Sequence, residues 1–177
     1  MYRFSDILPR GILFLLIIIS IPARSQDRLP EVSVKTNDGD YVRLSDYTAL
    51  GKPLIISFWA TYCPPCLEEF SRVSRLYDEW KKEIDFEFIA VSIDDARSSG
   101  RVKGLAEMKK WPFIMLLDEK NEAKKTMGYS DIPYYYITDN TGKIVFSHEG
   151  YSPGDENIMF QELKKVAKVG KSNVKQK

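Results

Sequence analysis

The chain has few sulfur and imidazole side chains. Its 177 residues include only two cysteines, Cys63 and Cys66, and one histidine, His148. Two cysteines cannot form the several long-loop bridges of a disulfide-stapled secreted domain. A tetrahedral structural zinc site needs four ligands, and these three residues supply too few. The shortage argues against both classes of protein, and we expect no metal and no other cofactor.

The chain also lacks an excess of charge of either sign. Lysine and arginine total 26, against 25 acidic residues. A protein that binds nucleic acid through its phosphates carries a basic surplus, so we expect no nucleic-acid partner. The length predicts one globular domain, residues 26–170, followed by a flexible basic tail, residues 171–177. We expect a monomer.

Long apolar runs are missing after the first 25 residues. There, Arg3 and Arg10 precede an apolar stretch, and small residues follow at Ala23 and Ser25. This pattern is typical of a secretory signal peptide, residues 1–25. Its roughly eleven apolar residues are too few to span a bilayer, which needs about 20. We expect an exported protein of the periplasm or cell envelope, soluble after cleavage or tethered if the signal is retained.

The remaining apolar patterns predict strands that alternate with helices. Alternation on both sides of the turn at 37–40 predicts an N-terminal β-hairpin. Continuous apolar runs predict buried strands at 54–60, 86–93 and 113–118, and helical patterns occur at 66–82, 101–110, 121–128 and 155–169. A second hairpin is expected over 134–148, and the last helix should turn Ile158, Leu163 and Val166 inward. The order predicts an α/β fold, a central mixed sheet with helices on both faces.

The two cysteines lie where the first buried strand meets its helix. The stretch 57–70 reads SFWATYCPPCLEEF. From Cys66 onward apolar residues recur at steps of four and three, which places Cys66 on the buried face of the helix. The prolines suit the first turn, where a backbone N–H is not needed. Cys63 therefore lies at the helix N-terminus, where free N–H groups and the dipole favour a thiolate.

This arrangement favours thiol–disulfide exchange. The reaction needs an exposed thiolate that attacks and a second thiol that resolves the mixed disulfide. Cys63 fits the first role, and Cys66, one turn later and facing the core, fits the second. A purely structural bridge is the weaker interpretation because so short a loop removes little unfolded-state entropy.

The motif FWATYCPPC resembles that of the exported TlpA/ResA-like thiol–disulfide oxidoreductases of the thioredoxin superfamily. The resemblance covers most of the chain after the leader and implies a thioredoxin-like fold, with Cys63 as nucleophile and Cys66 as resolver. Thioredoxins proper carry a buried aspartate where this chain has Ser57. The ResA-like proteins carry a glutamate three residues after the second cysteine, which implies that Glu69 assists proton transfer. Stabilisation of the helix dipole is the alternative role for Glu69.

The same resemblance implies a substrate-binding surface beside the dithiol. It places a cis-proline at Pro133, which would leave the backbone of Ile132 free to pair with an extended substrate peptide. Trp59 and Tyr62 flank the cysteines and are candidates for the floor and the exposed rim of this surface. Ordinary packing is the alternative for both aromatic residues.

The resemblance also implies a direction and partners. It points to a reductase of cysteine-containing exported proteins, for example in cytochrome c maturation, which receives electrons from a membrane thiol donor. An SCO-like copper metallochaperone is an alternative, although those proteins space their cysteines one residue wider. A redox-inert binding module is another, and a peroxiredoxin-like peroxidase would want a threonine where this chain has Ala60.

Overall fold

A seven-stranded mixed β-sheet, in the order β2-β1-β5-β4-β3-β6-β7, forms the centre of the molecule. The computed structural model describes residues 27–174, so the expected signal peptide and the last residues of the expected tail lie outside the described part. The strands are β1 Ser33–Thr36, β2 Tyr41–Arg43, β3 Leu54–Trp59, β4 Glu87–Ser92, β5 Ile114–Leu117, β6 Tyr134–Thr138 and β7 Ile144–Glu149. The helices are η1 Leu44–Leu50 (a 3₁₀ helix), α1 Pro64–Glu83, α2 Ser99–Lys109, α3 Glu122–Met127 and α4 Asp155–Val174.

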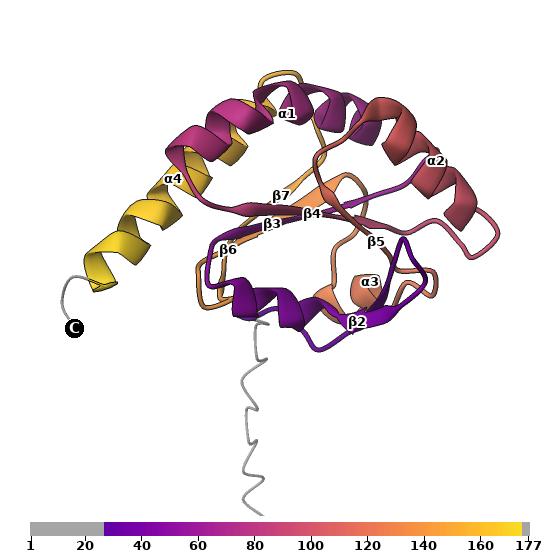
Figure 1. Ribbon diagram of the computed structural model, residues 1–177, viewed down its shortest axis with the longest axis horizontal. Helices are drawn as coiled ribbons and strands as arrows, with labels where there is room; N and C mark the ends of the chain where they lie inside the picture. Colours follow the sequence, from indigo (N-terminus) through magenta and orange to yellow (C-terminus); the bar gives the residue numbers. More distant parts are fainter. Residues whose placement is uncertain (1–26, 175–177) are drawn as a thin grey trace, which may run out of the picture.

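Helices cover both faces of the sheet, as the sequence predicts (Figure 1). Helices α1, α2 and α4 lie on one face, and η1 and α3 lie on the other. Each face has its own apolar core. One contains Trp59 and Phe70, and the other contains Phe58 and Leu44. The predicted α/β fold, with its N-terminal β-hairpin of β1 and β2, is confirmed.

Strand β3 is the central element that leads to the cysteines. All six of its residues are buried, in accord with their continuous apolar pattern. It runs parallel to β4, with Trp59 opposite Ser92, and antiparallel to β6, with Phe58 opposite Tyr134. The carboxyl end of β3 therefore lies beside the first residue of β6. This brings the segment after β3 next to the segment that precedes β6.

Helix α1 begins directly after Cys63, with two prolines in its first turn. Its buried face contains Cys66, Glu69, Phe70, Val73, Tyr77 and Trp80, which follow one another at steps of three or four residues, apart from the adjacent pair at 69 and 70. Phe70 packs edge-on against Phe88 and Trp111 in this core. The helix is thus anchored to the sheet along its whole length, starting one turn after the first cysteine.

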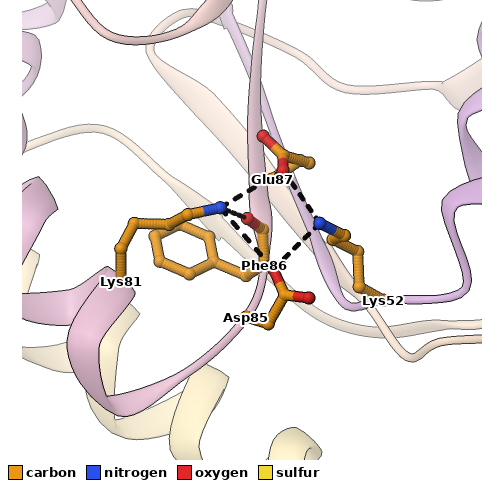
Figure 2. A network of polar contacts seen from close by, with 5 residues as sticks. All are labelled: Lys52, Lys81, Asp85, Phe86 and Glu87. Atoms are coloured by element: carbon orange, nitrogen blue, oxygen red, sulfur yellow. Dashed lines mark hydrogen bonds and ion pairs between the residues drawn. The ribbon is translucent and has the colours of Figure 1, made fainter.

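A network of charges fixes the opposite end of α1 (Figure 2). Lys81, in the last turn, donates to the backbone carbonyl of Phe86 and to the carboxylate of Glu87. Lys52, just before β3, donates to the carboxylates of Asp85 and Glu87. Because β3 starts here and ends at the cysteines, this network lies at the end of the sheet away from them.

The first described residues also join the sheet at that distant end. Arg28 forms a bridge with Lys143, and the N–H of Ile144 donates to the carbonyl of Asp27 at 2.8 Å. Gly142, in the turn between β6 and β7, has a φ of 81°, and a Cβ there would clash with Thr48. Glycine therefore suits this turn for both its backbone angle and its space.

Three local expectations differ from the structure. Ile158 is 42% exposed, and Met159 and Leu163 form the buried face of α4. Ile158 and Leu163 are five residues apart, about 140° around a helix, so they cannot share one face. Helix α4 continues to Val174 rather than ending at 169, and η1 was not predicted from the sequence. None of the helices within 27–174 combines the length and the apolar character needed to cross a membrane.

Candidate active site

The site is centred on a disulfide between Cys63 and Cys66, with a Cα–Cα distance of 5.3 Å. Cys63 is the N-cap residue of α1, and its sulfur accepts a hydrogen bond from the Cys66 N–H at 3.3 Å. Cys63 is 6% exposed, whereas Cys66 is fully buried. Both cysteines are therefore buried in the disulfide form, and of the two only Cys63, the residue that the sequence assigns to attack, keeps any exposed surface.

Pro133 lies at the same end of the sheet as this disulfide because of the strand register. The Ile132–Pro133 peptide bond is cis, as the resemblance implied. Tyr134, the next residue, opens β6 opposite Phe58 at the carboxyl end of β3. The carbonyl of Pro133 accepts a hydrogen bond from Gly150 at 2.8 Å, and the N–H of Ile132 is bound to the Asp131 side chain. The structure brings both residues to the end of the sheet that carries the cysteines.

Glu69 lies one turn after Cys66 on the same buried face of α1. It is 1% exposed, and its Oε2 accepts a hydrogen bond from the hydroxyl of Ser57 at 3.3 Å. Its Oε1 has no hydrogen-bond partner within residues 27–174. Ser57 occupies the position where thioredoxins proper have aspartate, so Glu69 brings a carboxyl group to that position from the neighbouring helix.

Burial raises the pKa of Glu69 from 4.5 to about 8. The hydrogen bond from Ser57 opposes this shift, while the negative charges of Asp155 and Glu156, at the start of α4, add to it. A carboxyl group at this position is therefore protonated at neutral pH. An acidic residue that is neutral and faces the core contributes little to the helix dipole, so the alternative role considered for Glu69 does not fit this environment.

A second buried polar group lies near Glu69 on strand β6. Tyr135 is opposite Ser57 in the sheet and is fully buried. Burial raises the pKa of its hydroxyl, and the charge of Glu69 adds to the shift. Its ring lies 5.3 Å from that of His148, whose Nε2 is 3.3 Å from Asp155 Oδ2. His148 therefore has a structural partner in Asp155.

The two aromatic candidates occupy different environments. Trp59 is fully buried, with its ring 5.2 Å from Phe70 and 5.4 Å from Trp111. In this structure it cannot reach a substrate and is part of the core beneath the site. Tyr62 is 68% exposed, directly before the attacking cysteine. Only Tyr62 of this pair is accessible to a partner.

Sequence reasoning missed one polar cluster beside the cysteines. Asp94, which the pattern placed in an undifferentiated loop, is buried and bonds to Thr61 of the active-site turn. The carboxyl ends of β3 and β4 lie side by side, and that adjacency was the signal available in the sequence. Within the described chain, no group of three or more His, Cys, Asp or Glu side chains could hold a metal ion.

A dithiol or disulfide at the start of the helix that follows a central strand, with a cis-proline at the same end of the sheet, defines a thioredoxin-like thiol–disulfide oxidoreductase. Comparison with known proteins agrees with this class. The profile of the AhpC/TSA family matches residues 25–147, and the chain belongs to that family.

Individual relatives are consistent with this assignment. The chain is 33% identical over 124 residues to the thioredoxin-like protein YneN of Bacillus subtilis, covering 68% of this chain and 69% of YneN. It is 27% identical over 137 residues to the thiol–disulfide oxidoreductase ResA of Bacillus thuringiensis subsp. konkukian, covering 77% and 75%. A solved thioredoxin-like protein from Porphyromonas gingivalis superposes with a TM-score of 0.72 at 39% identity, covering 81% of this chain and 93% of that one.

Proposed function

We propose that the protein is an exported reductase of protein disulfides. The observation that carries the proposal is the Cys63–Cys66 pair itself, in which Cys63 caps α1 and keeps a little exposed surface while Cys66 is fully buried. That asymmetry gives the two sulfurs separate tasks. Similarity to ResA supports the same chemistry.

The reaction transfers two electrons from the dithiol to the substrate. The Cys63 thiolate attacks one sulfur of a substrate disulfide, forms a mixed disulfide and releases the other substrate sulfur as a thiolate. Cys66 then loses its proton and attacks the Cys63 sulfur. This step forms the Cys63–Cys66 disulfide and releases the second substrate thiol. The protein ends oxidised and the substrate reduced.

Glu69 is the proposed proton carrier for the second step. A thiol has an ordinary pKa of about 8.5, and Glu69 has a pKa of about 8, so a proton passes between them at little cost in free energy. The unpartnered Oε1 can accept this proton when Glu69 is ionised, a form that a pKa of about 8 leaves in the minority at neutral pH and that grows as pH rises. Glu69 lies one turn after Cys66 on the same face of α1, so its side chain is on the same side of the helix as the resolving sulfur.

Tyr62 and the backbone of Ile132 are the proposed substrate contacts. Tyr62 is exposed directly before the attacking cysteine, and Ile132 precedes the cis-proline just before β6 begins. An extended peptide that displaces the Asp131 side chain from the Ile132 N–H and pairs with this backbone would present its disulfide to Cys63.

The proposed setting is the cell envelope. The leader pattern at 1–25 supports export, and an oxidising compartment requires an electron source to return the pair to the dithiol form. A membrane thiol protein is the proposed donor. Exported proteins with cysteines, such as apocytochrome c before haem attachment, are the proposed substrates.

The reduction potential of the Cys63–Cys66 pair tests the direction. Purified protein is equilibrated in dithiothreitol or glutathione buffers, and free thiols are quantified. A reductase should lie near the −270 mV of thioredoxin, and a value near the −120 mV of DsbA would overturn the proposal. A Cys66→Ser variant should also retain substrates as mixed disulfides on Cys63, whereas Cys63→Ser should retain none.

A further inference from the structure

Asp94 is a buried carboxylate that contacts the active-site turn. It lies just after the carboxyl end of β4 and is 2% exposed. Its Oδ2 accepts hydrogen bonds from the backbone N–H of Thr61 at 2.8 Å and from the hydroxyl of Ser92 at 2.7 Å. Its Oδ1 accepts a hydrogen bond from the hydroxyl of Thr61 at 2.6 Å. Three donors converge on one carboxylate, and two of them belong to Thr61.

Thr61 belongs to the short turn that links β3 to the attacking sulfur. The N–H of Cys63 donates to the carbonyl of Ala60 at 3.1 Å, which closes this turn around Thr61 and Tyr62. Both donors of Thr61, its backbone N–H and its hydroxyl, are bound by Asp94. The position of the turn therefore depends on a residue 33 positions further along the chain.

Asp94 is itself held firmly to the sheet. Its own N–H donates to the hydroxyl of Ser92 at 3.0 Å, and the N–H of Ile93 donates to the carbonyl of Trp59 at 2.9 Å. Ser92 pairs with Trp59 in the β3–β4 ladder and is fully buried. Hydrogen bonds to an ionised acceptor are roughly twice as strong as neutral ones. The carboxylate is therefore a rigid support beneath the turn.

We propose that Asp94 is a positioning residue for thiol–disulfide exchange, which holds Thr61 so that Cys63 stays at the N-cap of α1 when the disulfide opens. This inference rests on the proposed role of Cys63 as the attacking thiol. In the oxidised protein the S–S bond fixes Cys63 to Cys66. In the dithiol that constraint is gone, and the Thr61–Asp94 bonds retain the turn.

The direction in which the reduction potential should change follows from the position of Cys63 at the N-terminus of α1. A thiolate at Cys63 is stabilised by the free N–H groups and dipole of α1, an effect confined to the first turn. A turn that drifts away loses this stabilisation in the reduced protein, while the covalent bond preserves the oxidised form. Removing the support should therefore favour the disulfide and make the reduction potential more negative.

A set of variants separates positioning from general stability. Asp94→Ala removes all the acceptors, whereas Asp94→Asn keeps an oxygen for the Thr61 N–H and the Ser92 hydroxyl and gains an amide N–H that donates to the Thr61 hydroxyl once that hydroxyl rotates. Thr61→Val removes one donor, and Thr61→Ser keeps it. The matched control is Asp118→Ala, since Asp118 is also 2% exposed and binds three N–H groups, but at the start of α3.

The experiment measures the reduction potential of each purified full-length variant against dithiothreitol, and the pH dependence of Cys63 alkylation by iodoacetamide. Asp94→Ala should shift the exchange equilibrium about tenfold towards the disulfide, equal to about 30 mV, and slow alkylation at pH 7. Thr61→Val should shift the reduction potential and the alkylation rate in the same direction, by a smaller amount. Thr61→Ser should stay near wild type, Asp94→Asn should shift both quantities by less than Asp94→Ala because its hydrogen bonds are uncharged, and Asp118→Ala should lose stability without a shift in potential.

Wild-type values in both Asp94→Ala and Thr61→Val would overturn the proposal, as would an equal shift in Asp118→Ala. If Asp94→Ala does not fold, Thr61→Val decides. Alkylation of the wild-type dithiol at Cys66 before Cys63 would overturn the proposed function and this inference with it. If Cys63 is alkylated before Cys66, as expected, but the reduction potentials of the variants are unshifted, only the role of Asp94 is overturned.

Discussion

The hydroxyl of Ser57 donates a hydrogen bond to Glu69 Oε2 at 3.3 Å, between a strand residue and a helix residue that are both buried. The bond favours the charged form of the carboxyl group, and burial opposes it more strongly, so the pKa of Glu69 rises to about 8. This balance gives the chain a carboxyl group that titrates in the range of thiols. The effect of burial and the effect of the Ser57 hydrogen bond on the pKa of Glu69 can be measured separately with variants of the two residues.

Glu69→Gln should change how stability depends on pH. The folded pKa of about 8 lies above the ordinary value of 4.5, so the folded protein binds more protons than the unfolded chain between these values. The wild-type free energy of unfolding should therefore fall as pH rises from about 4.5 to about 8, by at most about 5 kcal/mol. The variant should lack this decline, so its stability relative to wild type should be higher at pH 9 than at low pH. Denaturant unfolding at several pH values measures it.

Glu68→Gln is the matched control for that series, because Glu68 is the exposed neighbour on the same helix. It should keep the wild-type decline. A Glu69→Gln profile parallel to wild type across this range would show that Glu69 does not carry the shifted pKa.

Ser57→Ala should raise the pKa of Glu69 further. The variant removes the hydrogen bond that favours the carboxylate and leaves the burial unchanged. Carbon-13 NMR titration of labelled glutamate carboxyl groups measures the shift directly. Ser71→Ala, which removes a hydroxyl bonded to the Leu67 carbonyl on the same helix, should leave the titration unchanged. An unchanged or lower Glu69 pKa in Ser57→Ala would contradict the assignment.

Tyr62→Ala and Trp59→Ala should have opposite consequences. Tyr62 is 68% exposed, so its removal should change stability by less than about 0.5 kcal/mol while slowing reduction of a protein disulfide several-fold. Trp59 is fully buried, and its truncation should cost about 3–5 kcal/mol. Unfolding curves measure the stability of each variant. The rates at which each variant reduces a protein disulfide and a small-molecule disulfide measure the loss of substrate contact. Tyr41→Ala, a similarly exposed tyrosine on β2, should affect neither; slower reduction there too would remove the case for Tyr62.

Lys81→Met should lower stability by about 1 kcal/mol without changing the reduction potential. Lys81 binds the Phe86 carbonyl and Glu87, and its ammonium lies 5.3 Å from the Phe86 ring centre (Figure 2). These contacts hold the end of α1 that is distant from the cysteines. Lys82→Met, at the exposed adjacent position, is the control for denaturant unfolding. A change in potential in Lys81→Met would mean that the two ends of the helix are coupled.

The strand–dithiol–helix unit could be predicted because local patterns specify it. The buried run of β3 and the three- and four-residue steps of α1 each occur within one segment, and the prolines mark where the helix begins. The position of Glu69 near the buried face followed from its offset of three residues from Cys66, whereas its complete burial did not. Its hydrogen bond to Ser57 connects two neighbouring elements of the same unit.

Contacts between distant segments were beyond the same reasoning. The one signal for the contact between Thr61 and Asp94 was that each follows a buried strand, and it names no pair of residues; only the parallel register of β3 and β4 brings these two together. The 3₁₀ helix η1 has no apolar periodicity of sufficient length to be recognised. On α4, the inward assignment of Ile158 failed because its spacing from Leu163 does not match a helical turn.

The bridge between Arg28 and Lys143 has a consequence for orientation. Strand β6 runs antiparallel to β3, so the turn that receives Arg28 lies at the opposite pole of the sheet from Cys63. A membrane tether attached ahead of Asp27 would therefore hold the molecule by its base. The dithiol would then face away from the bilayer, towards proteins that diffuse in the surrounding space, and a membrane-embedded donor would need to extend a domain outward to reach it.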